Sequence, residues 1–440
     1  MAKVDNCYVS SLDLFNGVTV NTSILDSKYV EYFPISPLSE DSPVEFSINS
    51  SEYTDLSDHF MVVNLHVVRK DGADFTDADK HKVCLAPLPG NSIFSVCENY
   101  MNNVLVSHST NCYGYRCFIE NLGTYNMNDF KGNMSLNLGY FDSWGEHKKL
   151  NATFFENYGL ARRRHATLTQ DIEVLCRLHL DLWNQEKLML PYVHNKVKLY
   201  RSKPYFPLIT AADSKDTYQI QVKEVSLFVR HVNVSPAISN AHKALLNTQP
   251  ASLPIKRVEM KTYSLPRGTK TFNQDNLYMG RLPMKIIIGL VDSRGFDGNA
   301  DYHPYYFLHE GLNKCALYCN GELVADYTPD FGTGDKPKLK CVREYFSLLQ
   351  STGQSWAKNS GFSQGLFNYT KGYALFGFNL SASGYNNCTN VIDVHKYGNC
   401  RLELGFSDET QNPHTLIVYA EYNANIEINK TRDVLIDYTP

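Results

Sequence analysis

The chain repeats one pattern of features, and this internal repeat limits its fold more than any other property. Val30–Arg69 and Val258–Ser293 each open with Val-Glu, pass a turn containing proline, reach a phenylalanine (Phe46 or Phe272) and end in an apolar strand. Such a repeat of features within one chain indicates two copies of one structural unit. A chain of 440 residues also exceeds what a single hydrophobic core supports. We therefore expect two like domains.

Three further feature pairs follow in the same order. Predicted hairpins end at Val106 and at Val324, and Asn320-Gly321 in the second is typical of a type I′ turn. Each hairpin leads into a predicted amphipathic helix, whose apolar residues share one face: Tyr115, Phe118, Ile119 and Leu122 in the first half, and Val342, Tyr345, Phe346 and Leu349 in the second. Arg177–Leu180 and Arg401–Leu404 are then expected to begin matching strands with alternating leucines.

The composition and the strand pattern favour sheets throughout. Tyr (29) and Phe (23) are abundant, and about eight strand-like segments per half are separated by turn residues. The second half offers the clearest examples: Lys285–Val291, Lys314–Cys319, Glu322–Asp326, Tyr373–Leu380, Arg401–Phe406 and Leu416–Tyr422. We predict an all-β chain, with two tandem eight-stranded jelly-roll β-sandwiches and short helices in loops. The Cys…Trp…Cys pattern of immunoglobulin-like sandwiches is absent.

A proline-bounded segment separates the two halves. Ser235 is a good helix N-cap and Pro236 suits the first helical position, so a short linker helix is expected there. The predicted organisation is listed along the chain as an N-terminal arm (residues 1–29), a first jelly roll (30–234), a linker with a short helix (235–254) and a second jelly roll (255–440).

Charge and cysteine usage exclude several classes of protein. The net charge is −4, and Met1–Tyr29 contains only Lys3 and Lys28, so no cationic arm for nucleic acid is visible. The start has no apolar stretch of the length of a secretory signal, which favours synthesis in the cytosol. Eleven cysteines form no disulfide framework. Cys315 and Cys319 would lie about 13 Å apart on a strand, too far for a disulfide, so reduced, buried thiols are expected.

An ordered set of segments resembles the major capsid proteins of Maverick/Polinton elements and the related adintoviruses. The segments are Asp171–Lys203, Val225–Leu246, Arg257–Ser293, Lys371–Leu380, Arg401–Phe406 and Ile417–Tyr438. The resemblance implies a double jelly-roll capsid protein (hexon), whose homotrimers form pseudo-hexagonal capsomers of an icosahedral shell around double-stranded DNA. It also implies a single jelly-roll penton protein as partner, a location in the virion capsid, and neither catalytic residues nor a cofactor.

Several motifs resemble known sites of chemistry, and each departs from the pattern that its chemistry requires. Gly361-Phe362-Ser363-Gln364-Gly365 matches the hydrolase G-x-S-x-G pattern but follows a polar loop in place of a buried strand. The Asp297–Asp301 segment has the carboxylate spacing of a calcium loop but lacks its glycine and its final glutamate, so a turn is favoured. His303, His309, Cys315 and Cys319 match no common zinc spacing.

Two hypotheses remain beside the capsid role. Arg162, Arg163 and Arg164 form the basic run of the chain, which could face DNA or direct nuclear import, although a solvated loop before Ile172 is the favoured interpretation. The alternative function is a two-domain carbohydrate-binding or glycosidase-type β-sandwich protein, with Trp144, Trp183 and Trp356 as possible sugar platforms.

Overall fold

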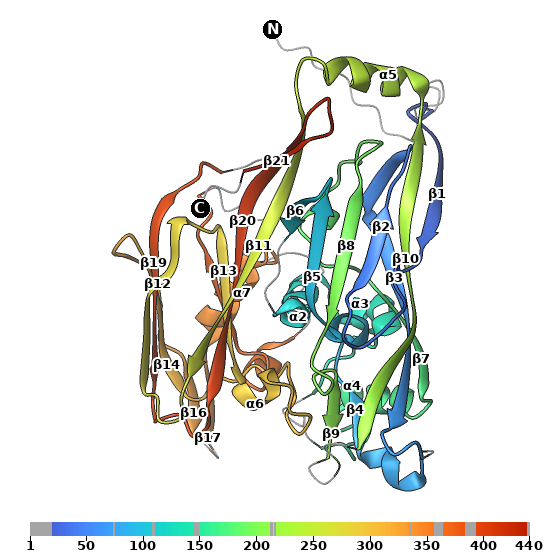
Figure 1. The fold of residues 1–440 in the computed structure, drawn as a ribbon. Coiled ribbons are helices and arrows are strands. Elements are labelled where there is room, and N and C mark those ends of the chain that lie inside the picture. Colours follow the sequence, from blue (N-terminus) through green and yellow to red (C-terminus); the bar gives the residue numbers. More distant parts are fainter. Residues whose placement is uncertain are drawn as a thin grey trace, which may run out of the picture.

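The two halves of the chain form two β-sandwiches that stand side by side (Figure 1). The computed structural model describes residues 20–73, 75–107, 111–143, 149–211, 214, 217–333, 336–355, 364–382 and 393–437. Within these ranges no helix is both long and apolar enough to cross a membrane.

The first sandwich contains two four-stranded sheets and a small two-stranded one. One sheet has the order β1 (Ile24–Tyr32), β10 (Tyr218–Val234), β3 (Tyr53–Arg69) and β7 (Asp171–Cys176). The other has the order β2 (Val44–Ile48), β8 (Asn195–Arg201), β5 (Phe94–Met101) and β6 (Val104–Ser107). The strands β4 (Val83–Leu85) and β9 (Leu208–Thr210) form a separate short pair. In the sequence β4 follows β3 and β9 follows β8.

The second sandwich has the same plan. Its first sheet has the order β11 (Ala251–Leu265), β20 (His414–Ile428), β13 (Lys285–Asp292) and β18 (Leu375–Asn379), with β21 (Val434–Ile436) also paired to β20. Its other sheet has the order β12 (Thr271–Arg281), β19 (Tyr397–Phe406), β14 (Leu312–Cys319) and β15 (Glu322–Tyr327). A separate pair consists of β16 (Asp330–Thr333) and β17 (Lys336–Lys340).

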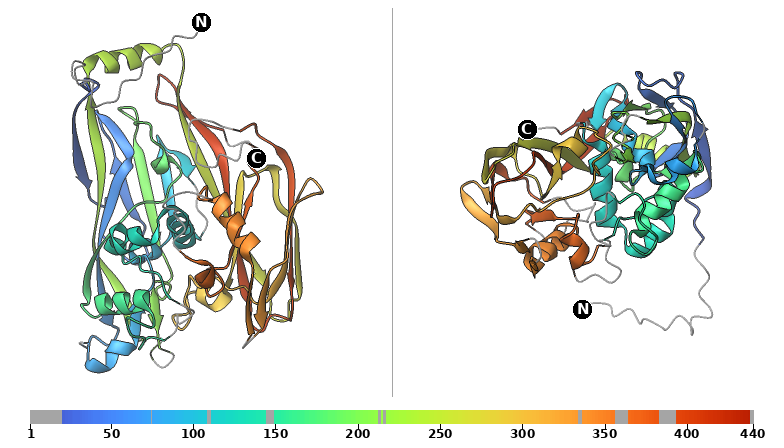
Figure 2. Two further views of the ribbon diagram at one scale, coloured as in Figure 1. Left: turned by 180° about the vertical axis from the view of Figure 1, so that it is seen from behind. Right: turned by 90° about the horizontal axis from the view of Figure 1, so that it is seen from below.

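Short helices occupy the connections. The α-helices are α1 (Pro89–Ser92), α2 (Tyr113–Thr124), α3 (Met127–Lys131), α4 (Tyr158–Thr167), α5 (Pro236–Leu245), α6 (Ser293–Phe296), α7 (Val342–Ser351) and α8 (Leu366–Tyr369). Among the described residues, 3₁₀ turns span Asp77–His81, Asn133–Asn137 and Leu182–Asn184. The helix α5 connects the two sandwiches at one end of the molecule, as Figure 2 shows from behind.

The two sandwiches share one topology, strand for strand. When the eight main strands of each half are numbered along the chain, both halves give the sheet orders 1-8-3-6 and 2-7-4-5. This antiparallel arrangement is that of the jelly roll, so the predicted fold class is confirmed. The repeat found in the sequence falls on equivalent strands, since Phe46 lies in β2 and Phe272 in its counterpart β12.

The predicted type I′ turn and linker helix are confirmed, although the side chain of Ser235 makes no capping hydrogen bond. Asn320 and Gly321 both have positive φ, as a type I′ turn requires, and they connect β14 directly to β15. The helices α2 and α7 follow their hairpins in both halves. The helix α5 has Ser235 as its N-cap and proline in its first turn. The strand β1 begins at Ile24, before the position 30 at which we placed the first jelly roll.

One of the four sequence pairs is wrong. Arg401–Leu404 lies in β19, but Arg177–Leu180 follows β7 and belongs to no strand; the counterpart of β19 is β8. The leucines do alternate into the core, since Leu178 and Leu180 are buried. The backbone N–H groups there bind side chains in place of a neighbouring strand: that of Leu178 donates to His59 Nε2 at 2.9 Å, and that of His179 to the hydroxyl of Tyr113 at 3.2 Å.

His59 fixes this segment as a neutral imidazole. Its Nε2 accepts from Leu178, so its Nδ1–H donates to the Leu56 carbonyl at 2.6 Å. Its ring packs at 4.7 Å on the edge of Trp183. Burial, with Arg177 in support, lowers the pKa of His59 to about 3.

We expect His59→Phe to lower the free energy of unfolding by about 2 to 4 kcal/mol, because it leaves a buried N–H and a buried C=O unpaired. The unfolded state takes up the proton of His59 near pH 6.5, whereas the folded state does not until about pH 3. The stabilisation is therefore present above pH 6.5 and is lost as the pH falls below it. Urea titrations between pH 7 and 5 should show a steeper loss of stability for the native chain than for the variant; equal slopes would contradict this assignment.

The two jelly rolls are joined through their cores as well as through the linker. The core of the second roll includes Tyr115, Phe118 and Ile119 from α2 of the first roll. The core of the first roll includes Ile255 from β11 and Ile426 from β20. Since each roll completes the apolar core of the other, we expect the pair to unfold as one unit.

The corresponding sheets of the two rolls differ in how they are covered. In the second roll, β20 has eleven consecutive buried residues and β13 has seven, so both faces of this sheet are covered. In the first roll, the matching strands β10 and β3 largely alternate between buried and partly exposed residues, and β1 has no buried residue. Continuous burial is typical of a sheet between two layers, and alternation of a sheet with one open face.

Candidate functional site

The surface between the two rolls contains a cluster of buried charges that begins on α2. Arg116 and Glu120 lie one turn apart on this helix, with Nε and Oε1 2.8 Å apart. Arg116 also binds Asp181, which follows the strand-free segment, through Nη2 and Oδ1 at 2.7 Å. Arg116 is 1% exposed, and a charge at such depth is tolerated only when its partners are close and well oriented.

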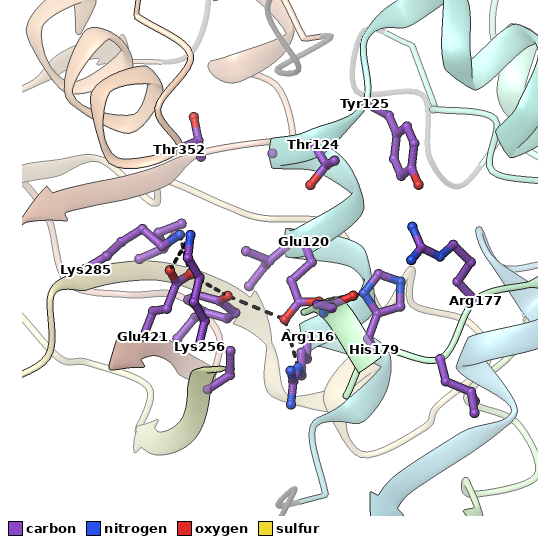
Figure 3. A pocket seen from close by; sticks show the side chains of 17 residues that line it. Arg116, Glu120, Thr124, Tyr125, Arg177, His179, Lys256, Lys285, Thr352 and Glu421 are labelled. Atoms are coloured by element: carbon purple, nitrogen blue, oxygen red, sulfur yellow. Dashed lines mark hydrogen bonds and ion pairs between the residues drawn. The ribbon is translucent and has the colours of Figure 1, made fainter. Parts of the chain in front are cut away.

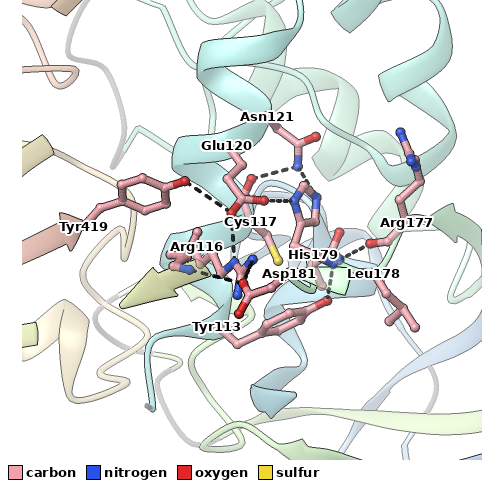
Figure 4. Close-up of polar contacts among 12 residues, drawn as sticks. Tyr113, Arg116, Cys117, Glu120, Asn121, Arg177, Leu178, His179, Asp181 and Tyr419 are labelled. Atoms are coloured by element: carbon pink, nitrogen blue, oxygen red, sulfur yellow. Dashed lines mark hydrogen bonds and ion pairs between the residues drawn. The ribbon is translucent and has the colours of Figure 1, made fainter. Parts of the chain in front are cut away.

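The cluster continues into the second roll. The backbone N–H of Val258 on β11 donates to Asp181 Oδ1 at 3.2 Å, and the hydroxyl of Tyr419 on β20 lies 3.5 Å from Glu120 Oε1. Tyr419 also donates to Glu421 at 3.2 Å. Figure 4 shows Tyr419 approaching from the second roll toward the carboxylate of Glu120. These contacts fix the position of one roll against the other.

Arg116, Glu120 and Tyr419 also line a cavity of about 300 Å³ between the rolls. On its far side Glu421 binds Lys285 at 2.5 Å and lies 3.5 Å from Lys256. Figure 3 shows both lysines converging on Glu421, with Glu120 and His179 across the cavity. Each carboxylate in the cavity thus has a cation beside it.

The electrostatics hold these carboxylates ionised. Burial alone would raise the pKa of Glu120, but Arg116 and His179 outweigh it and bring that pKa to about 2. Burial is likewise opposed at Glu421, where Lys285 and Lys256 lower the pKa. A carboxylate that stays ionised at neutral pH and is fully engaged in ion pairs is poorly suited to acid–base catalysis. The arrangement therefore acts as a structural junction.

The basic run Arg162–Arg164 lies outside this cavity, and its predicted local structure is wrong. Arg162–Arg164 belong to α4, so the expected solvated loop is wrong. Arg163 is fully buried and binds Asp142 through Nη2 at 2.8 and 2.9 Å, which anchors the helix. Arg164 donates to the carbonyls of Leu150 and Ala152. Arg162 is exposed, and its guanidinium lies over the rings of Phe154 and Tyr158.

The other motifs are dispersed. His303 binds Asp142 at 2.8 Å, and His309 stacks on Phe331. Within the described ranges no group of three or more His, Cys, Asp or Glu could hold a metal ion. The segment after α6 is a turn, with Gly298 at a φ of +83° and Asp297 paired to Lys203.

Two motifs fall partly or wholly outside the described residues. Gly361, Phe362 and Ser363 of the G-x-S-x-G motif are among them, as are Trp144 and Trp356. Trp183 is fully buried beside His59, so it cannot stack on a sugar.

The charged junction between the two rolls is not predicted from the sequence. The spacing of Arg116 and Glu120 is visible in the sequence, but pairs at this spacing usually lie on exposed helix faces. Only the tertiary structure shows that the second roll covers this side of α2, because residues from β11, β13 and β20 line the same cavity.

Comparison with known proteins identifies the fold. No family model matches the chain. A curated relative, uncharacterized protein F54H12.2 of Caenorhabditis elegans, is 23% identical over 431 residues, which cover 94% of this chain and 98% of that protein.

Solved structures are similar over nearly the whole chain. A chain of the Sputnik virophage has a TM-score of 0.64 at 14% identity, covering 100% of this chain and 94% of that one. The capsid of the virus PBCV-1 gives 0.59 at 11% identity, with 97% and 100% covered. The mavirus major capsid protein gives 0.58 at 12% identity, with 99% and 94% covered. The chain therefore has the double jelly-roll fold of these viral capsid proteins.

Proposed function

We propose that the chain is a structural capsid subunit that assembles into homotrimeric, pseudo-hexagonal capsomers of an icosahedral shell around double-stranded DNA. The proposal assigns it no catalytic activity and no cofactor. Its support is the fold, which it shares with the mavirus major capsid protein over 99% of its length, and an asymmetry between its two rolls. That asymmetry is the observation on which the proposal depends.

The asymmetry is that the two equivalent sheets differ in their contacts. The sheet of the second roll packs against the first roll, whereas the matching sheet of the first roll has no such contact within the described part of the chain. The sheet containing β11, β20 and β13 covers α2 of the first roll, since Val258, Ile287 and Tyr419 line the cavity with Arg116 and Glu120. The matching sheet containing β1, β10 and β3 lies on the far side of the first roll, away from the second (Figure 1). The open sheet of the first roll in one chain can therefore pack against the second roll of a neighbouring chain.

The open sheet presents an aromatic patch, defined here as Tyr29, Phe60 and Phe228. Phe60 and Phe228 stack with ring centroids 4.7 Å apart, and Tyr29 lies 5.4 Å from Phe60. Tyr29 is 50% exposed although it is in a strand. Their neighbours in sequence, Met61, Leu227 and Val229, point into the core, so the patch is on the outer face. Aromatic clusters of this kind are enriched at protein interfaces.

The contact between the two rolls is of a kind that can repeat between chains. The rolls are alike and packed with different surfaces in contact, which makes the contact heterologous. When such a contact repeats from the second roll of one chain to the first roll of the next, it generates either a ring or a filament. Three chains would supply six like rolls, which is the ring that the resemblance to capsid proteins implies.

The finer assignments follow from the resemblance. We propose a Maverick/Polinton-type or adintovirus-like lineage, a location in the virion capsid, and a single jelly-roll penton protein as partner. The predicted domain limits 30–234 and 255–440 are kept as a proposal except at the starts of the rolls, since β1 begins at Ile24 and β11 at Ala251. A role for Arg162, Arg163 and Arg164 in facing DNA or in import stays a prediction, with Arg162 as the exposed member.

The test is the mass of the purified chain, measured by light scattering, together with negative-stain imaging. We expect a particle of about 150 kDa, three times the 50.0 kDa of the chain, with a hexagonal outline, or capsid-like particles. A protein that stays at 50 kDa at high concentration, or one that forms a twofold dimer, contradicts the proposal.

A further inference from the structure

Two cysteines face each other across neighbouring strands of the second roll. Cys319 ends β14 and is the register partner of Cys400 in β19, with their Sγ atoms 3.2 Å apart. The adjacent N–H of Asn320 donates to the Asn399 carbonyl at 2.9 Å, so the cysteine pair is a non-hydrogen-bonded position of the ladder. Cα atoms at such positions are about 4.5 Å apart, which is within the range that a disulfide spans.

This pair differs from the other thiols in access and in charge. None of the nine cysteines in the described ranges is in a disulfide; Cys319 is partly exposed and the other eight are buried. A hydrogen bond from Cys400 lowers the pKa of Cys319 against the effect of burial, and Lys396 adds to this. The same bond raises the pKa of Cys400. Cys319 is thus the nucleophile of the pair and Cys400 the resolving thiol.

We propose that Cys319 and Cys400 form a reversible redox modification site that closes to a disulfide by exchange with a low-molecular-weight disulfide such as glutathione disulfide. The Cys319 thiolate attacks one glutathione sulfur and releases one glutathione thiolate, which takes up a proton. The Cys400 thiol then loses its proton and attacks Cys319 Sγ, which releases the second glutathione. One disulfide is reduced to two thiols while the two cysteines are oxidised.

The disulfide would connect β14 to β19 across a long stretch of chain, and a covalent link of this kind restricts the unfolded state. A glutathione pool of cytosolic potential keeps such a site open, whereas an oxidising medium closes it. The inference is independent of the proposed capsid role, because it needs only the folded second roll.

The folded protein is equilibrated with oxidised and reduced glutathione, its remaining thiols are alkylated, and its peptides are mapped by mass spectrometry. We expect a peptide linked through Cys319 and Cys400, and a midpoint of thermal unfolding several degrees higher, reversed by dithiothreitol. Cys319→Ser should abolish both effects. The matched control is the Cys7→Ser, Cys388→Ser double variant, which lacks the two cysteines outside the described residues and should keep both effects.

Two outcomes overturn the inference. One is a glutathione adduct that persists on Cys319 while the Cys400 thiol remains open to alkylation after unfolding. The other is a gain in thermal midpoint that survives Cys319→Ser. Because Cys319 is at the partly exposed end of a strand, its serine variant should fold, which circular dichroism at neutral pH checks directly.

Discussion

Replacing Arg116 with methionine is expected to lower the free energy of unfolding by about 3 to 5 kcal/mol, the cost of breaking a buried ion pair from one side. The methionine fills much of the space of the arginine, but it leaves Asp181 without its guanidinium partner and Glu120 with only His179 and the more distant Tyr419 hydroxyl. Asp181 is buried and the side chain of Glu120 is only 14% exposed, so water replaces the lost partner incompletely. Urea unfolding at pH 7 measures the effect.

The matched control is Arg401→Met. Arg401 also lies beside two carboxylates, Asp275 and Glu403, but its side chain is 44% exposed on β19. An exposed pair contributes at most about 1 kcal/mol, so this variant should unfold close to the native chain. Equal losses for the two variants would show that the junction has no special weight in stability.

A second comparison separates the ion pairs from simple packing. If unpaired charge causes the loss, then adding Glu120→Gln and Asp181→Asn to Arg116→Met should recover part of it, since the remaining groups are neutral. If the three changes add to a larger loss, the packing of α2 is the cause. The acid limb should also change, because Glu120 has a folded pKa of about 2. Its contribution is present above its unfolded value near 4.5 and is lost as the pH falls toward 2.

The sequence predicted the parts of the fold that local chemistry determines. A two-residue turn at Asn320-Gly321 and a helix that begins at Pro236 depend on neighbours in the chain alone. The strand predicted at Arg177–Leu180 is wrong, because alternating leucines indicate only that one side of a segment is buried. The backbone N–H groups of this segment bind the side chains of His59 and Tyr113, so the leucines alternate without a partner strand.

The junction and the buried arginines could not be predicted for a different reason. Arginine on a helix is usually exposed, so the sequence gives no sign that Arg116 and Arg163 are buried. Their burial results from elements distant in the chain: β20 of the second roll near Arg116, and the segment around Asp142 near Arg163. The apolar runs Ile286–Val291 in β13 and Leu416–Ala420 in β20 are visible in the sequence, yet they do not tell which neighbouring layer covers the second face of the sheet. Long-range packing decides that.

Phe228→Glu is expected to convert the proposed trimer into a monomer while the fold of the chain is retained. Phe228 belongs to the aromatic patch and stacks on Phe60, on the face of β10 that the described part of the chain leaves partly exposed. A carboxylate there stays hydrated in the single chain but would be desolvated against the second roll of a neighbour. Loss of a central aromatic contact costs about 2 kcal/mol or more per interface, and three interfaces would be affected at once.

Light scattering should therefore show a fall from about 150 kDa to the 50.0 kDa of one chain, at an unchanged far-ultraviolet circular dichroism spectrum. Phe155→Glu is the matched control, because Phe155 is fully exposed and remote in sequence from the patch, and it should leave the trimer intact. A Phe228→Glu protein that still forms trimers would show that the open sheet is not the subunit contact. Since the equivalent sheet of the second roll is covered on both faces, that result would mean that the contact inside the chain is not repeated between chains.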